Sequence, residues 1–247
     1  MKLRNTLTTA GRKVHQEKID ISQLKLSHIK THYDQPQMDW KNMLMIVPIP
    51  NKRYKSIVLD RARGLYALKQ SPDQLIDYFK KEHPLACPRT LRELANFVGI
   101  KNYIPFVTGE VKFAPLKTNK ECHHRAWVSV SPMSSCFPEL GNNCSIHFDG
   151  VDELVLVDQT HHFVEHRVQD TIKLSGAQES YLYQAAQIVD NYEHVTIEFP
   201  KNHTIGDLDI SAFFKFYAAH SIEIICDYLD YELAEEDLKA MINKLMS

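Results

Sequence analysis

Residues 43–68 have the sequence MLMIVPIPNKRYKSIVLDRARGLYAL, which predicts three consecutive strands. Met43–Pro50 is an apolar run closed by prolines, Ser56–Asp60 is a second short run, and Leu65–Leu68 follows the tight connection Arg61–Gly64. Short apolar runs bounded by Pro, Gly and polar residues are typical of buried strands. This stretch therefore predicts part of a β-sheet, with basic residues in both of its connections.

Signals for helices and further strands follow. Ser71 can cap a helix whose first position is Pro72, and a second short helix over Thr90–Val98 ends at Gly99. Ser, Pro and Gly are favoured at these cap positions. Four later runs predict strands: Tyr103–Val107, Val111–Phe113, Ala126–Val130 and Cys144–Phe148.

The C-terminal half begins with a hairpin. Asp149 and Gly150 form a strong hairpin signal, and Glu153–Val157 is the return strand. Thr160 can cap a helix that Gly176 interrupts, and a further helix and acidic helical segments follow. The order of elements predicts an α+β fold: a small, mostly antiparallel β core with interspersed helices and an acidic helical C-terminal extension.

The composition is that of an ordinary folded protein. The chain has 247 residues, 44% hydrophobic and 24% charged, which excludes disordered and low-complexity classes. No run reaches the roughly 18 consecutive apolar residues of a membrane span, and the N-terminus lacks the apolar core of a signal peptide. We therefore expect a cytoplasmic protein with no membrane partner, whose five cysteines are reduced thiols.

The charge is unevenly distributed. Residues 1–125 contain 23 Lys and Arg against 11 Asp and Glu, whereas residues 126–247 contain 6 against 20. A basic half of this kind indicates an anionic partner such as nucleic acid. The alternative is that the two halves neutralise each other within one fold.

One segment resembles the first half of a helix-turn-helix unit. In TLRELANFVGI, residues 90–100, Ala95 would allow close helix packing and Gly99 would form the turn. The second helix should occupy the following residues, but Pro105 falls within them and would break it. The segment therefore favours a capped helix that leads into a strand.

A zinc-dependent hydrolase is an alternative hypothesis. Residues 162–166 match the H-x-x-E-H pattern, in which His162 and His166 share one helix face and Glu165 could act as general base. A second possible zinc site lacks the close cysteine pair of most structural sites. Its residues are Cys122, His123, His124, Cys136 and Cys144.

Nucleotide and acyl-transfer motifs are missing from the sequence. There is no phosphate-binding loop, no dinucleotide fingerprint and no nucleophile elbow. We therefore expect a protein that is not an enzyme and uses no cofactor.

The basic residues at predicted loops and strand ends are the candidate DNA contacts. Arg and Lys at such positions can reach phosphates or enter a narrow minor groove. The candidates are Lys52, Arg53, Lys55, Arg61, Arg63, Arg89, Arg92, Lys101, Lys117, Lys120 and Arg125.

Several sequence blocks occur in a recognisable order. They are Leu44–Pro48; Ser56–Asp60; Cys87–Thr90 with Gly99 and Lys101–Phe106; Phe113–Thr118 with Cys122 and Ala126–Val130; and Ile146–Gly150 with Glu153–Leu156 and Thr160–Leu174. In this order they resemble the ComK family of competence transcription factors of Gram-positive bacteria, over residues 43–175.

The resemblance implies a transcriptional activator of DNA-uptake genes. Such a protein binds A/T-rich double-stranded DNA, largely through the minor groove, as a homo-oligomer, and adaptor-mediated proteolysis controls it. We expect a basic polar arm over residues 1–38, a ComK-like DNA-binding domain over 39–190 and the acidic extension over 191–247. The arm and the extension are departures from the family, and Ile197–Lys201 is a faint match to its adaptor-binding segment.

A third hypothesis is a protein-interaction module whose working surface is the acidic C-terminal helices. The partner would then be a protease adaptor or another protein.

Overall fold

The computed structural model describes residues 2–35, 38–82, 88–118, 121 and 123–190, and the single positions 213, 216, 217, 219, 236, 237 and 240. At residues 82, 88, 89, 118 and 184–190 it describes the backbone alone. The chain divides into two compact units. The β unit comprises Met1–Pro88 and Asn102–Ser175, and the helical unit comprises Arg89–Lys101 and Gly176–Ser247.

The predicted three-strand stretch forms the middle of a seven-stranded sheet. Strands β3 (Met43–Pro48), β4 (Ser56–Asp60) and β5 (Gly64–Leu68) pair antiparallel in succession, and every residue in them is buried. The sheet has the order β2-β5-β4-β3-β8-β7-β6. Its other strands are β2 (Thr31–Tyr33), β6 (Phe106–Thr108), β7 (Val111–Thr118) and β8 (Arg125–Ser129).

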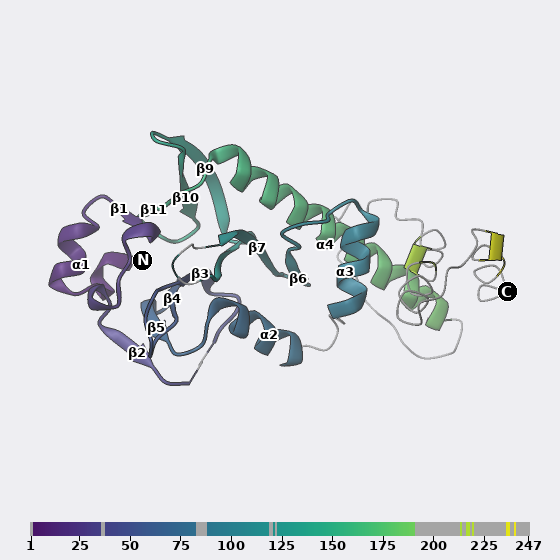
Figure 1. Cartoon of the computed structure of the whole chain (residues 1–247), viewed down its shortest axis with the longest axis horizontal. Helices are drawn as coiled ribbons and strands as arrows, with labels where there is room; N and C mark the ends of the chain where they lie inside the picture. The colour runs from purple at the N-terminus through teal and green to yellow at the C-terminus, as the bar shows by residue number, and fades with distance from the viewer. Residues whose placement is uncertain are drawn as a thin grey trace. The chain divides into compact units, whose positions relative to one another are not determined.

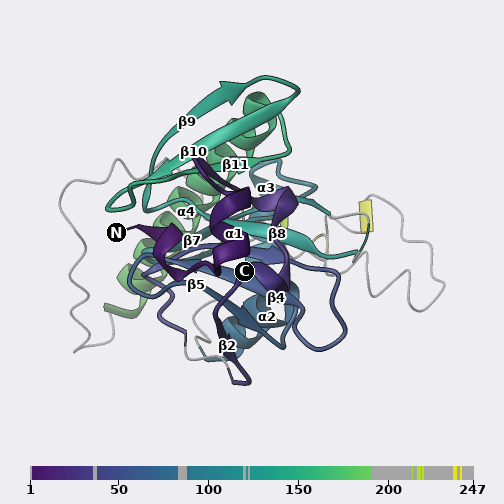
Figure 2. The same ribbon diagram turned by 90° about the vertical axis from the view of Figure 1, so that its left-hand side faces the viewer.

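A second, four-stranded sheet covers one face of the first (Figure 2). Its order is β1-β11-β10-β9, and the hairpin between β10 and β11 turns at Gly150, whose φ is 76°. The strands are β1 (Lys18–Asp20), β9 (Met133–Glu139), β10 (Asn143–Phe148) and β11 (Leu154–Val157). Among the strand pairs only β1–β11 and β2–β5 are parallel in the described residues, so the β core is mostly antiparallel.

The main hydrophobic core lies between the two sheets and the first turns of helix α4 (His161–Asp190). Its buried side chains include Leu44, Val47, Ile57, Leu59, Ile146, Phe148, Val155 and Val164. The hydroxyl of Thr160 accepts a hydrogen bond from the backbone N–H of Phe163 at 3.3 Å, so the predicted cap of this helix is confirmed.

Helix α2 (Pro72–Glu82) packs on the opposite face of the seven-stranded sheet (Figure 2). Ser71 and Gln74 form a capping box, with Gln74 N–H donating to Ser71 Oγ at 3.3 Å and Ser71 N–H donating to Gln74 Oε1 at 2.9 Å. The buried ring of Phe79 lies 4.2 Å from Trp40 and 5.1 Å from Phe106, centroid to centroid. These aromatic contacts form a second, smaller core between α2 and the sheet.

Residues 2–33 lie within the predicted basic polar arm, residues 1–38, but contribute buried side chains to the main core. In Figure 1 this segment is purple and ends beside the β-strands of the unit. The segment contains helix α1 (Thr9–Val14) and three 3₁₀ helices, Leu3–Thr6, Ile21–Gln23 and Leu26–His28. Leu3 and Leu7 are completely buried, and the Glu153 carboxylate accepts hydrogen bonds from the N–H groups of Leu3 and Arg4 at 2.8 and 3.1 Å. The sequence did not predict this packing, because the apolar residues of the segment are widely spaced among many lysines.

The helical unit contains most of helix α3 (Pro88–Phe97) and the second half of α4. The predicted end of α3 is confirmed: Gly99 has φ of 85°, and the N–H of Ile100 donates to the carbonyl of Ala95 at 2.7 Å. The predicted break at Gly176 is wrong, because α4 runs without interruption through a glycine that a helix interior tolerates at about 1 kcal/mol.

A small aromatic cluster organises the helical unit. The buried ring of Phe213 lies 5.6 Å from Phe97 and 5.6 Å from Tyr181, and Phe216 lies 5.5 Å from Phe97. These two positions belong to the predicted acidic extension, so that segment contributes to the packing of α3 and α4 within this unit. Most of residues 191–247 lies outside the described residues.

The fold is α+β, as the sequence predicted. Within the described residues, no helix combines the length and apolar character needed to cross a bilayer.

Candidate nucleic-acid interface

The register of the strands brings several predicted DNA contacts together at the edge of the seven-stranded sheet that is formed by strand ends. Pro48 pairs with Ser56, Ile46 pairs with Trp127, and Thr118 pairs with Arg125. The end of β3, the start of β4, the end of β7 and the start of β8 therefore lie side by side, spaced by about 4.8 Å per strand. We call the side chains of Lys52, Arg53, Lys55, Lys117 and Arg125 at these strand ends the basic edge.

The loop between β3 and β4 supplies three members of the basic edge. The Asn51 carboxamide oxygen accepts hydrogen bonds from the N–H groups of Arg53 and Tyr54 at 2.9 and 3.0 Å, which fixes a tight turn. Lys52, Arg53 and Lys55 are exposed on this turn, and the Arg53 guanidinium lies 5.3 Å from the centre of the Tyr54 ring. The turn thus holds three cations in solvent beside an aromatic ring.

The Asp34 carboxylate partly neutralises the positive charge of this loop. Lys69 lies 3.0 Å from the Asp34 carboxylate, and Arg53 lies 3.9 Å from it. The hydrogen bond from Lys69 holds the pKa of Asp34 below its usual value. Within the described part of the chain, no carboxylate lies in ion-pair range of Lys52 or Lys55.

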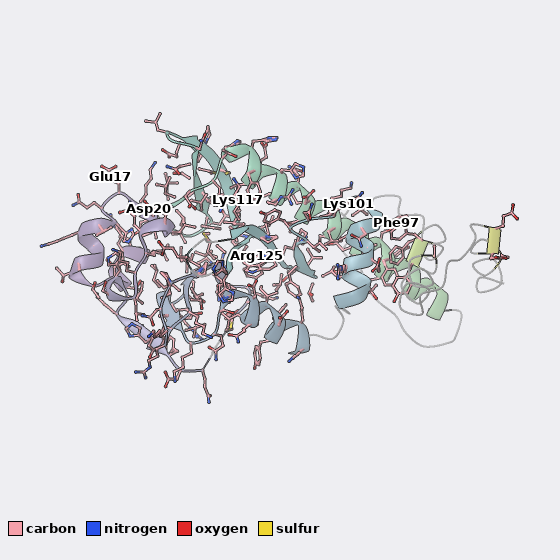
Figure 3. The ribbon with its side chains drawn as sticks, viewed as in Figure 1. Glu17, Asp20, Phe97, Lys101, Lys117 and Arg125 are labelled. Carbon is pink, nitrogen blue, oxygen red and sulfur yellow. The ribbon has the colours of Figure 1, made fainter. Side chains whose placement is uncertain are left out.

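A second group of cations surrounds two aromatic rings at the same edge. Tyr103 precedes β6, and its ring lies 5.5 Å from that of Phe163, on the first turn of α4, in an edge-to-face arrangement. The Arg125 guanidinium lies 5.7 Å from the Tyr103 ring centre, and the Lys117 ammonium lies 4.9 Å from that of Phe163. Figure 3 labels Lys117 and Arg125. Arg167 lies 5.4 Å from Tyr103 and 5.5 Å from Phe163. These five residues are the Tyr103 cluster.

Arg167 anchors the Tyr103 cluster to the protein. Its side chain is only 11% exposed, and it donates to the carbonyl of Asn102 at 3.0 Å and pairs with Asp170 at 2.9 Å. Tyr103 itself has φ of 53°, a left-handed conformation that is strained for a bulky residue. Backbone strain of this kind persists where the surroundings over-determine it and is common at functional sites.

Lys117 and Arg125 present their charge differently from Arg167. Lys117 is exposed and Arg125 is half-buried, and among the described residues neither has a carboxylate in ion-pair range. Each charge is held over a ring face, where it remains available to an anion.

Comparison of the chain with protein-family models, curated proteins and solved structures finds no match. The predicted resemblance to the ComK family stays a prediction.

The two predicted arginines of the β4–β5 turn lie at the other end of the sheet. Arg61 and Arg63 follow Asp60, which is separated from Ser56 by the whole of β4, about 13 Å at 3.3 Å per residue. The Arg61 guanidinium donates to the Asn42 side-chain oxygen at 3.2 and 3.3 Å and so ties this turn to the segment before β3. The structure therefore does not bring this pair together with the basic edge.

The remaining predicted contacts fall elsewhere. Arg92 and Lys101 are exposed and belong to the helical unit, as does Arg89, of which the backbone alone is described. Lys120 lies outside the described residues. Residues 101–105 are not helical, as expected from Pro105, so the segment after α3 is a turn that leads into β6.

The two zinc hypotheses find little geometric support. The rings of His162 and His166 are 6.4 Å apart, and His166 Nδ1 is in hydrogen-bond range of Arg167 at 2.7 Å and Asp170 at 3.2 Å. Cys122 lies outside the described residues, and His124 contacts Asp73. In the described residues no group of three or more His, Cys, Asp or Glu side chains is placed to hold a metal ion.

Sequence reasoning missed Tyr103, Phe163 and Arg167. The signal for the last two was their spacing of four residues on one predicted helix, which places them on one face. Nothing in the sequence alone indicated that this face meets Tyr103.

Proposed function

We propose that the protein is a DNA-binding transcription regulator of the ComK-like class that contacts double-stranded DNA with its basic edge and Tyr103 cluster. The observation that supports this is the convergence of five predicted basic residues, from two separate strand connections, at one edge of one sheet. Arg167 and two aromatic rings join them there.

The chemistry of the edge suits a polyanion. Exposed lysines at loop tips can follow phosphates without fixed geometry, as Lys52, Lys55 and Lys117 would. An arginine whose plane is held over a tyrosine ring, as Arg125 is, loses less side-chain freedom when it enters a narrow minor groove. A/T-rich sequences have such grooves, and the ComK resemblance supports the same preference.

The finer parts of the proposal rest on the resemblance. They are activation of DNA-uptake genes, assembly as a homo-oligomer and contact with a protease adaptor. A cytoplasmic location, a further protein partner and the lack of enzymatic activity are proposed from the sequence instead.

The experiment that tests the proposal is fluorescence anisotropy of the full chain with an A/T-tract duplex and a matched G/C-rich duplex over a salt series. If the five side chains of the basic edge each neutralise one phosphate, log affinity should fall with log salt with a slope of about −4.5. The A/T-tract duplex should bind more tightly. A slope near zero, or no binding to either duplex at low salt, would refute the proposal.

A further inference from the structure

Two cysteines meet across the β9–β10 hairpin. Cys136 lies on β9 opposite Ile146, and Cys144 lies on β10 opposite Pro138, so the two are diagonal neighbours in the sheet. Their Sγ atoms are 2.6 Å apart, closer than unbonded sulfur atoms normally approach, although both are free thiols. Neither residue belongs to the basic edge or the Tyr103 cluster.

The surroundings distinguish the two sulfur atoms. Cys144 is completely buried in the main core, whereas Cys136 is partly exposed at its margin, on the edge strand of the four-stranded sheet. The contact between the thiols lowers the pKa of Cys144 and raises that of Cys136. Because it is partly exposed, Cys136 is the sulfur that a small molecule can reach. The buried Cys144 sulfur can react only with Cys136.

We propose that Cys136 and Cys144 are a reversible redox modification site, which closes to a disulfide on reaction with a small-molecule disulfide. The S–S bond is about 2.05 Å long, so the two sulfurs need to approach by only about half an ångström. An intramolecular bond between neighbouring strands needs no rearrangement of the sheet register.

The reaction is two successive thiol–disulfide exchanges. The Cys136 thiol passes its proton across the thiol–thiol contact to Cys144, and the Cys136 sulfur attacks one sulfur of the small disulfide, whose other half leaves as a thiolate and takes up a proton. Cys144 then releases its proton, its thiolate attacks the Cys136 sulfur of the mixed disulfide, and the second half leaves in the same way. Two protein thiols are oxidised, and one small disulfide is reduced to two thiols.

The bond would add a covalent link to an edge strand, which pairs with a single neighbouring strand. β9 pairs with β10 alone in its sheet, and the Cys136 carbonyl is in hydrogen-bond range of His161 Nε2 at 3.2 Å, at the start of α4. Oxidation therefore changes the rigidity of the hairpin at the point where it meets α4.

The chain offers a convenient readout. Trypsin cleaves after Arg125 and Arg167, and the segment between them contains Cys136 and Cys144 but no other cysteine, Lys or Arg. The full-length protein is equilibrated with defined ratios of oxidised and reduced glutathione, alkylated, digested and weighed by mass spectrometry. The disulfide form of this peptide is two hydrogen atoms lighter than the reduced form and carries no alkyl group.

The native protein should form this disulfide with an equilibrium constant at least about tenfold above that of the same chain in urea, a difference of about 30 mV. In Cys144→Ser, Cys136 should stop at a single glutathione adduct. Equal constants for native and unfolded chains would overturn the proposal. So would a glutathione adduct on Cys136 of the wild-type protein in place of the internal bond, a result that needs no variant to fold.

Discussion

Replacement of Glu153 by Ala should weaken the attachment of the first turn of the chain, Leu3–Thr6, to the β unit. The carboxylate is buried at the start of β11 and accepts hydrogen bonds from the N–H groups of Leu3 and Arg4, 150 and 149 residues away in sequence. The Arg4 guanidinium lies 3.5 Å from the same carboxylate. Farther along the segment, β1 pairs with β11 through its backbone, so the Glu153 carboxylate anchors only the first turn of the chain.

The expected loss of stability follows from these contacts. The bond to the buried Leu3 N–H is charge-assisted, and its removal leaves that donor without an acceptor, which costs about 1.5–3 kcal/mol. The Arg4 N–H is only partly buried, so water can replace its acceptor at about 1 kcal/mol. The Arg4 ion pair adds less than about 1 kcal/mol, because the arginine side chain is 38% exposed and water screens the pair. We expect Glu153→Ala to lower the free energy of unfolding by about 3 kcal/mol.

Urea denaturation followed by tryptophan fluorescence measures this loss. Glu153→Gln keeps one acceptor oxygen and should lose about half as much, and Glu17→Ala, which removes an exposed acid from the same segment, should change stability by less than about 0.5 kcal/mol. If Glu153→Ala were as stable as Glu17→Ala, the Glu153 carboxylate would not anchor Leu3 and Arg4 in the folded protein.

Three further predictions concern the fold. Gly64→Ala should destabilise the β unit by more than about 2 kcal/mol, because φ is 79° and a Cβ would lie 2.2 Å from the Thr6 side chain. Gly99→Ala, with φ of 85° but open space around it, should cost about 1 kcal/mol. Thermal unfolding compares the two variants. The rings of His15 and His28 are in hydrogen-bond contact at 3.2 Å, and burial lowers the pKa of both. The two neutral rings therefore contribute fully to the stability of the fold above pH 6.5, and this contribution is lost as pH falls below it. Urea midpoints at pH 7.5 and 5.5 should therefore differ more in the wild-type protein than in His15→Gln/His28→Gln, and equal differences would contradict this. Phe213→Ala should lower the stability of the helical unit by about 3–5 kcal/mol, which would appear as faster amide hydrogen exchange in α3. Unchanged exchange would contradict the packing of Phe213 against Phe97.

The local elements were predictable because their signals are local. The strands around residues 43–68 follow from apolar runs bounded by Pro and Gly, and the starts of α2 and α4 follow from the hydroxyl caps Ser71 and Thr160. Strand β9 was not predicted, because Ser, Pro and Glu interrupt any alternation in MSSCFPE. The strand forms because it pairs with β10, a tertiary contact that local sequence does not indicate.

The candidate site was predictable in residue type but not in position. The net positive charge of residues 1–125 drew attention to the lysines and arginines of the basic edge, yet nothing in the sequence separated Arg61 and Arg63 from them. Their separation follows from the register of β4 with β5. The placement of the β3–β4 loop beside the start of β8 depends on the pairing of β3 with β8. Their partners Ile46 and Trp127 are 81 residues apart and carry no shared local signal.

The most direct test of the account compares two variants with equal loss of charge. Lys52→Gln/Lys55→Gln removes two exposed cations from the basic edge, and Arg61→Gln/Arg63→Gln removes two from the opposite end of the sheet. Anisotropy with the A/T-tract duplex should show a salt slope shallower by about 1.8 for the first variant and unchanged for the second, if each lysine neutralises one phosphate. The reverse pattern, or equal slopes in both variants, would contradict the claim that the basic edge is the DNA-binding surface.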